Sequence, residues 1–208
     1  MKKILLFAMM IPGMCAFASS NAPKSVLASV DKVVWAGVDY SQARFIGAGQ
    51  FNNPAEIFPG MLEAWNQLVL TERMRFLEKE LHKPVVADIA GMTKINKSAS
   101  DKQIVNAPGA GDTIHDSQIT AEKIAKAVRS YKLENKSGIA VVFIVDRLVK
   151  VDKKGEGAVY VVAFNIGTRE VLSSARIEGN AVGIGFRNYW FRVVKDAEKG
   201  LGTIFKEL

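Results

Sequence analysis

The sequence predicts an α/β protein: a mixed sheet of about five strands in the order β-α-β-α-β-β-β-α, with the helices packed on the sheet. Two patterns indicate this fold class. In the first part of the chain, short apolar runs typical of buried strands alternate with a longer segment of helical periodicity. In the last part, three strand-like runs follow one another across short polar turns. Crossovers give parallel pairing and a meander gives antiparallel pairing, so we expect a mixed sheet.

The first two expected strands each run into an aspartate. Residues 33–38 form a compact β-prone run that reaches Asp39, and residues 85–89 form a second run that contains Asp88. Between them, helical periodicity extends over residues 59–80, with a proline at the start, where the first turn of a helix tolerates it.

The remaining elements are predicted from capping, periodicity and turn residues. Thr120 is placed to cap a helix that ends near Leu133 and has one apolar face. Residues 40–58 and 91–117 contain glycine, proline and asparagine without an apolar period, which predicts loops. The three consecutive strands and the last helix are expected at residues 139–145, 159–164, 171–177 and 185–208.

The first 18 residues have the three parts of a secretory signal peptide. Lys2 and Lys3 precede an apolar run, and residues 16–18 offer a cleavage site of the small-x-small type. The apolar run is too short to span a bilayer, so we expect no transmembrane segment. The predicted organisation is a signal peptide at 1–18, a flexible leader at 19–30 and a single α/β domain at 31–208.

The single cysteine, Cys15, lies within this signal sequence. A lipoprotein would carry its lipid on Cys15, but Met14 stands where such a cleavage site prefers a small residue. Cleavage after Ala18 is therefore favoured over lipidation, and the exported chain would then have no cysteine and no disulfide. We expect a periplasmic or cell-surface protein.

Composition narrows the classes of function and partner. With 49% hydrophobic and 24% charged residues, the chain is too apolar for intrinsic disorder. Its formal charge of +7 allows weak association with anionic surfaces. Nucleic acid is not expected, because no basic stripe is interleaved with aromatic residues. No cofactor is expected either, and the glycines at 109 and 111 lack the residues of a phosphate-binding loop. The chain has no G-x-S-x-G elbow, which argues against the usual hydrolase fold.

Three short strings carry a resemblance to a family. They are residues 183–190 (GIGFRNYW), residues 64–68 (AWNQL) with Glu72, and residues 38–41 (VDYS). Together they resemble segments of small uncharacterised secreted proteins from Gram-negative gut bacteria. That family has no assigned activity, so the resemblance implies export and no particular function. The element order is also similar to envelope accessory domains that assist outer-membrane or cell-wall machinery, which is an analogy of fold alone.

Two groups of residues are candidates for chemistry. Asp39 and Asp88 follow expected parallel strands, whose carboxyl ends share the sheet edge where ligands usually bind. They could form an acid–base pair or a cation site, or simply begin turns. In the loop at 109–116, Asp112, His115 and Asp116 could hold a metal or pair for general-base work. Their spacing matches no established metal motif, and Asp116 could instead initiate a turn.

A third group involves the helices. On a helical wheel Glu72 falls on the apolar face, so we expect it to be buried and paired with Arg187, with Arg75 as the local alternative. Such a pair would dock two helices, or Glu72 would face a cleft as a functional carboxylate. Arg187 and Asn188 stand at the first turn of the last helix, where free N–H groups could also hold an anion.

These observations favour an exported, non-catalytic envelope binding or accessory protein with a protein or glycan partner. The alternative is a hydrolase or metal-dependent enzyme that uses Asp39, Asp88 and the 109–116 loop. The arrangement of the carboxylates distinguishes the two: clustering with His115 in one cleft would favour the enzyme, and dispersal would favour the binding protein.

Overall fold

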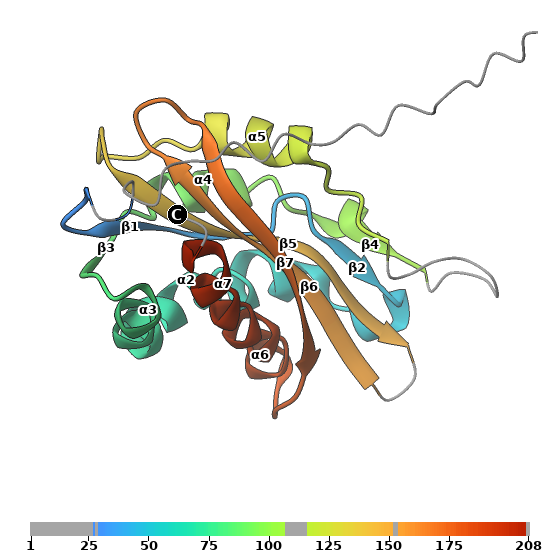
Figure 1. Cartoon of the computed structure of the whole chain (residues 1–208). Coiled ribbons are helices and arrows are strands. Elements are labelled where there is room, and N and C mark those ends of the chain that lie inside the picture. Colours follow the sequence, from blue (N-terminus) through green and yellow to red (C-terminus); the bar gives the residue numbers. More distant parts are fainter. Residues whose placement is uncertain (1–26, 28, 107–115, 152–153, 207–208) are drawn as a thin grey trace, which may run out of the picture.

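The computed structural model describes residues 27, 29–106, 116–151 and 154–206, and it confirms the α/β fold class (Figure 1). Its sheet has seven strands. The strands are β1 (Val33–Asp39), β2 (Arg44–Ile46), β3 (Val85–Ala87), β4 (Ile104–Val105), β5 (Ile139–Val151), β6 (Lys154–Asn165) and β7 (Val171–Ala181). The α- and π-helices are α1 (Pro54–Glu56), η2 (Ile57–Met61), α2 (Ala64–Leu68), η3 (Val69–Arg73), α3 (Met74–Leu81), α4 (Ala90–Asn96), α5 (Ala121–Ser130), α6 (Phe186–Ala197) and α7 (Leu201–Lys206).

The sheet has two strands more than the expected number of about five, because β2 and β4 lie in segments predicted to be loops. The seven strands lie in five rows. β6 pairs with one edge of β5 along its whole length. The other edge of β5 is shared: β1 pairs with it up to Ile144, and β2 pairs with it from Arg147 onward. β3 and β4 lie outside them in the fifth row. The rows of β1 to β5 are parallel, whereas β5, β6 and β7 form an antiparallel meander. The predicted mixture of pairings is therefore confirmed.

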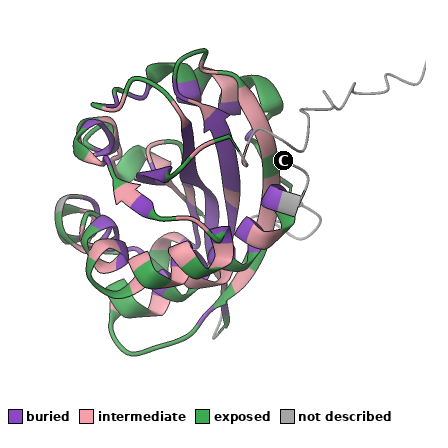
Figure 2. Ribbon diagram, turned by 60° about the vertical axis from the view of Figure 1, so that its left-hand side comes forward, coloured by how far each residue is buried: buried purple, intermediate pink, exposed green. Residues whose placement is uncertain are grey.

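Each face of the sheet buries its own apolar core. Trp35 of β1 belongs to the core beneath α2, α3, α6 and α7, whereas its neighbour Val34 belongs to the core beneath α4 and α5. Figure 2 shows the central strands buried between helices whose outer surfaces are exposed. β5 is buried on both faces, as its continuous apolar sequence predicts. α6 turns Trp190 into the first core.

The elements after residue 116 follow the sequence pattern closely. Thr120 caps α5 by accepting a hydrogen bond from the Lys123 amide at 3.3 Å. The helix ends at Ser130, earlier than predicted, and Tyr131 leaves it in an extended conformation. All three meander strands are longer than predicted, and the last helix begins after Gly185 as expected but is divided into α6 and α7 by a short 3₁₀ turn.

The helical segment between β1 and β3 differs from the predicted regular α-helix. Two π-helical turns, Ile57–Met61 and Val69–Arg73, interrupt it. Each adds about one residue to a turn and so rotates the following side chains by about 100° on a regular wheel. The prediction that Glu72 is buried and paired with Arg187 is wrong for this reason. The Glu72 side chain is 51% exposed, and its carboxylate lies 3.9 Å from the ammonium of Lys195.

The predicted loop at residues 91–117 is also wrong in part, because it contains most of α4. Gly91 and Thr93 give this short segment a low intrinsic helix propensity. Met92 packs in the core that includes β1, and the Asn96 side chain hydrogen-bonds to the β1 backbone. Tertiary contacts of this kind, which a single-sequence pattern does not contain, stabilise the helix.

A buried ion pair joins the π-helical segment to the C-terminal helices. The Arg73 Nε donates to both carboxylate oxygens of Glu198 at 3.0 Å, and the Glu198 side chain is fully buried. Burial raises the pKa of Glu198 above its ordinary value, while the hydrogen bonds from Arg73 act in the opposite direction. The docking role expected of Glu72 and Arg187 therefore belongs to Arg73 and Glu198.

We predict that Arg73→Ala lowers the free energy of unfolding by about 3–5 kcal/mol, because it leaves the Glu198 carboxylate buried without a partner. Urea denaturation measures the change. Arg75→Ala, an exposed arginine on the same helical segment, should change it by less than about 0.5 kcal/mol. The double variant Arg73→Met, Glu198→Met should recover most of the loss, and equal destabilisation by both single arginine variants would contradict the assignment.

Candidate functional site

β1 loses its outer neighbour before its own end, and two asparagine side chains take over the hydrogen bonding. Asn66 of α2 accepts from the Val38 amide at 2.7 Å and donates to the Val38 carbonyl at 3.3 Å. Asn96 of α4 donates to the same carbonyl at 2.8 Å and accepts from the Tyr40 amide at 3.0 Å. Both side chains are buried. The asparagines therefore satisfy backbone groups that would otherwise be buried without partners.

Gly37 permits this close approach. Its φ of +109° lies in a region that residues with a side chain rarely adopt, and a Cβ at this position would lie 2.9 Å from the Asn66 Oδ1. The backbone of β1 is irregular at the same point, where its register with β5 shifts between Trp35 and Gly37. A glycine is thus required where the asparagine reaches the strand.

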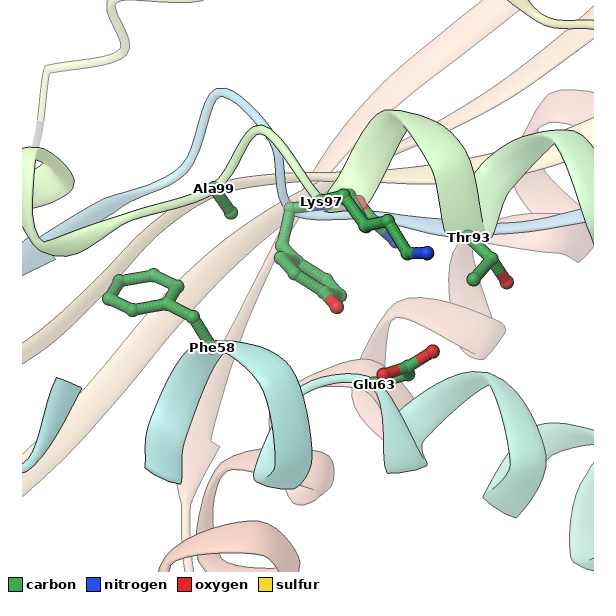
Figure 3. A pocket seen from close by; sticks show the side chains of 7 residues that line it. Phe58, Glu63, Thr93, Lys97 and Ala99 are labelled. Atoms are coloured by element: carbon green, nitrogen blue, oxygen red, sulfur yellow. Dashed lines mark hydrogen bonds between the residues drawn. The ribbon is translucent and has the colours of Figure 1, made fainter. Parts of the chain in front are cut away.

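A cavity of about 170 Å³ opens beside the end of β1. Figure 3 shows Phe58 and Glu63 on one wall and Thr93, Lys97 and Ala99 on the opposite wall. The first wall belongs to the helical segment that follows β1, and the second belongs to α4 and the residues after it. The complete lining is Tyr40, Phe58, Glu63, Thr93, Asn96, Lys97 and Ala99. We call this cavity the Tyr40 pocket.

The backbone amide, the backbone carbonyl and the ring of Tyr40 all have partners, whereas its hydroxyl has none in the described part of the chain. Asn96 accepts from its amide at 3.0 Å, Gln103 donates to its carbonyl at 3.0 Å, and Trp65 packs edge-on to its ring with the centroids 6.3 Å apart. The residue is 2% exposed. Within the described part of the chain, its hydroxyl has no hydrogen-bond partner. The hydroxyl oxygen is not among the fully buried side-chain atoms that lack a partner, so it reaches the surface of the cavity and is available there to a ligand or to water.

The hydroxyl of Tyr40 keeps its proton at ordinary pH. Burial raises the pKa of Tyr40 well above its ordinary value, and the negative charges of Glu63 and Asp39 act in the same direction. A protonated phenol can donate one hydrogen bond and accept others. The pocket thus combines a neutral donor at its base with a carboxylate and an ammonium group at its walls.

The three strings noted in the sequence meet around Trp65. Its neighbour Asn66 hydrogen-bonds to Val38, its ring packs on Tyr40, and its indole Nε1 donates to the Arg187 carbonyl at 3.2 Å. Three segments that are far apart in the sequence therefore meet at Trp65, which contacts both the start of α6 and the residue after β1.

Asp39 and Asp88 are buried, and donors from elsewhere in the fold occupy both. Asp39 accepts from the Tyr131 hydroxyl at 2.7 Å and from the Ser41 amide at 2.8 Å. Asp88 accepts from the backbone amide and the side-chain amide of Asn135 at 2.9 and 3.0 Å. Both carboxylates thus join the ends of strands to neighbouring segments.

The other predicted residues are not among those that line the Tyr40 pocket. Asp112 and His115 fall outside the described residues. Asp116 is exposed, and its backbone carbonyl accepts a hydrogen bond from Arg44. Arg187 and Asn188 are exposed at the start of α6, where the Arg187 Nε donates to the Asn188 Oδ1 at 3.2 Å.

The sequence reading therefore missed the residues that line the pocket. Tyr40 stood in one of the quoted strings, directly after Asp39, and that was the one available signal. Glu63, Asn96 and Lys97 gave none, because each belongs to a helical segment whose position depends on long-range contacts.

Within the described ranges, no group of three or more histidine, cysteine, aspartate and glutamate side chains could hold a metal ion. No described helix is both long enough and apolar enough to cross a membrane.

Comparison with known proteins adds little to this geometry. No protein-family model matches the chain, and no curated protein matches it. Among solved structures, the chain is similar to the hypothetical protein CT253 from Chlamydia trachomatis, with 13% sequence identity and a TM-score of 0.32. The similarity covers 86% of this chain and 91% of that one.

We predict that Asn66→Ala lowers the free energy of unfolding by about 1–3 kcal/mol, because the buried Val38 amide loses its acceptor. Thermal or urea unfolding measures the change. Gln67→Ala, which truncates the exposed neighbour on α2, is the matched control and should have little effect. An Asn66 variant as stable as the control would show that β1 does not depend on this side chain.

Proposed function

We propose that this chain is an exported, non-catalytic accessory protein of the cell envelope, and that the Tyr40 pocket binds one residue of a protein or glycan partner. The observation that carries the proposal is the Tyr40 hydroxyl, which lies at the cavity, keeps its proton and has no hydrogen-bond partner in the described part of the chain. A hydroxyl that faces a cavity without a protein partner can bind a ligand or an ordered water there.

The size of the pocket suits a small part of a larger partner. A cavity of about 150 Å³ in another protein binds benzene, so the volume of about 170 Å³ here accommodates one ring or one amino-acid side chain. Its lining combines an apolar wall at Phe58 and Ala99 with polar groups at Tyr40 and Thr93. Such a mixture is typical of sites that orient a ligand with a few polar contacts.

The environments of the two strand-end aspartates favour binding over catalysis. The alternative enzyme, a hydrolase or metal-dependent enzyme, would use Asp39, Asp88 and the 109–116 loop around one cleft. Asp39 and Asp88 instead accept hydrogen bonds from Tyr131 and Asn135, two residues of the connection between α5 and β5, so donors of the fold already occupy these carboxylates. A carboxylate that serves as a general base needs free access to the proton it removes.

Two features support the envelope as the location and anionic groups as weak partners. The first is the signal-like sequence at residues 1–18. The second is a hollow of about 390 Å³ between α4 and the segment after α5, whose lining includes Lys94, Lys132 and Lys136. Lysines at its surface attract anionic groups in a way that salt weakens.

We predict that Tyr40→Phe weakens binding of the envelope partner by about 2- to 10-fold, because one hydrogen bond to the ligand is lost. Binding is measured against separated envelope glycans and envelope proteins, with wild-type protein and Tyr40→Phe side by side. Tyr189→Phe, a tyrosine outside the pocket, is the control. Equal binding by wild type and Tyr40→Phe would place the binding surface elsewhere, and turnover of a separated component would favour the enzyme.

We also predict that the exported protein begins at Ser19. N-terminal sequencing of the secreted or periplasmic fraction tests this, since cleavage after Ala18 exposes that residue. A chain that begins at a lipid-modified Cys15 would identify a lipoprotein instead.

A further inference from the structure

Two opposite charges stand on opposite walls of the Tyr40 pocket. Glu63 lies on the wall formed by the helical segment after β1, and Lys97 lies on the wall formed by the end of α4 (Figure 3). Within the described residues, neither side chain forms an ion pair, whereas surface carboxylates such as Glu72 do find a lysine. The two walls thus present a carboxylate and an ammonium group that remain available to a ligand.

The charges and the phenol act on the same small volume. Glu63 lines the same cavity as Tyr40, and its negative charge is one of the causes that raise the pKa of Tyr40. Lys97 and Asn96 are consecutive, and Asn96 holds the Tyr40 amide at 3.0 Å, so the backbone that carries Lys97 is anchored to the base of the pocket. Phe58 and Ala99 complete the lining with apolar surface.

We infer that the Tyr40 pocket selects a small zwitterion of the α-amino-acid type. The ammonium group of the ligand lies at Glu63, its carboxylate lies at Lys97, and its apolar side chain packs on Phe58. The Tyr40 hydroxyl donates to an oxygen of the carboxylate. This inference rests on the proposed function, because it names the chemical group that the proposed binding pocket recognises.

The physical reason is the match of two charges at once. A hydrogen bond with an ionised partner is about twice as strong as one between neutral groups. A neutral sugar would form an ion pair with neither Glu63 nor Lys97. A ligand with a single charge would pair with one of these two residues and leave the other without a partner. The zwitterion is either a free amino acid or a residue that is attached to a larger envelope polymer through its side chain.

Four probes with one carbon skeleton separate these contributions. Leucine carries both charges, leucinamide carries the ammonium alone, 4-methylpentanoate carries the carboxylate alone, and 4-methylpentanamide carries neither. Dissociation constants are measured by NMR titration of the full exported chain at about pH 6.5, where the ammonium and carboxylate groups of the probes are ionised. Leucine should bind about tenfold tighter than either singly charged probe, and the neutral amide should bind weakest.

Variants of the two charged walls give the sharper test. In Glu63→Gln, the affinity for leucine should fall to that for 4-methylpentanoate, because the ammonium no longer has a partner. In Lys97→Met, it should fall to that for leucinamide. Glu56→Gln and Lys102→Met, which remove exposed charges outside the pocket, should leave the order of the probes unchanged.

Nε-acetyl-lysine distinguishes the two sources of the ligand, because its zwitterion is free while its side chain is acylated, as at a peptide branch. Binding comparable to that of leucine supports an attached residue, and much weaker binding supports a free amino acid. The inference fails if no probe binds, if 4-methylpentanamide equals leucine, or if the wall variants keep the wild-type order. The proposed function itself fails differently, through binding of an envelope component that Tyr40→Phe leaves unchanged.

Discussion

The structure depends on how β1 is completed after its outer neighbour ends. β3 pairs with β1 only as far as Trp35, and beyond it Asn66 and Asn96 bind the backbone of Val38 from helices on opposite faces of the sheet. An amide side chain carries one acceptor and two donors, so it can replace an adjacent strand at a single residue. The same contacts fix α2 and α4 relative to the sheet and hence determine the walls of the Tyr40 pocket.

The neighbouring strand β5 is also irregular. β5 passes from β1 to β2 across a bulge at Asp146, between the residues that pair with the two strands. Bulges redirect side chains and often lie beside functional sites. Here the buried Asp146 carboxylate accepts from the Arg176 Nε at 2.9 Å and from the Ser117 hydroxyl at 3.0 Å. The bulge therefore lies at a group of buried polar contacts that joins β5 to β7 and to the segment before α5.

Two kinds of charged side chain differ in their surroundings: buried carboxylates with donors from the fold, and exposed charges at the pocket. Asp39, Asp88 and Glu198 are buried, and each is satisfied by donors from distant segments, which is how a fold retains a carboxylate in its interior. Glu63 and Lys97 are exposed at the pocket and keep their charges available to a partner. The proposed binding site therefore uses Tyr40 and the two charges beside it, and not the buried aspartates at the strand ends.

The sequence by itself determined the elements whose signals are local. The long meander strands, the capped helix α5 and the inward face of α6 follow from apolar periodicity and capping, which act between near neighbours. Tertiary structure alone decided α4, the short strands β2 and β4, and the π turns that expose Glu72 and bury the Arg73–Glu198 pair. It also decided the pocket, because contacts with Asn96, Gln103 and Trp65 bury Tyr40 and leave its hydroxyl at the cavity. Those contacts span up to 63 residues, a separation at which no local pattern carries information.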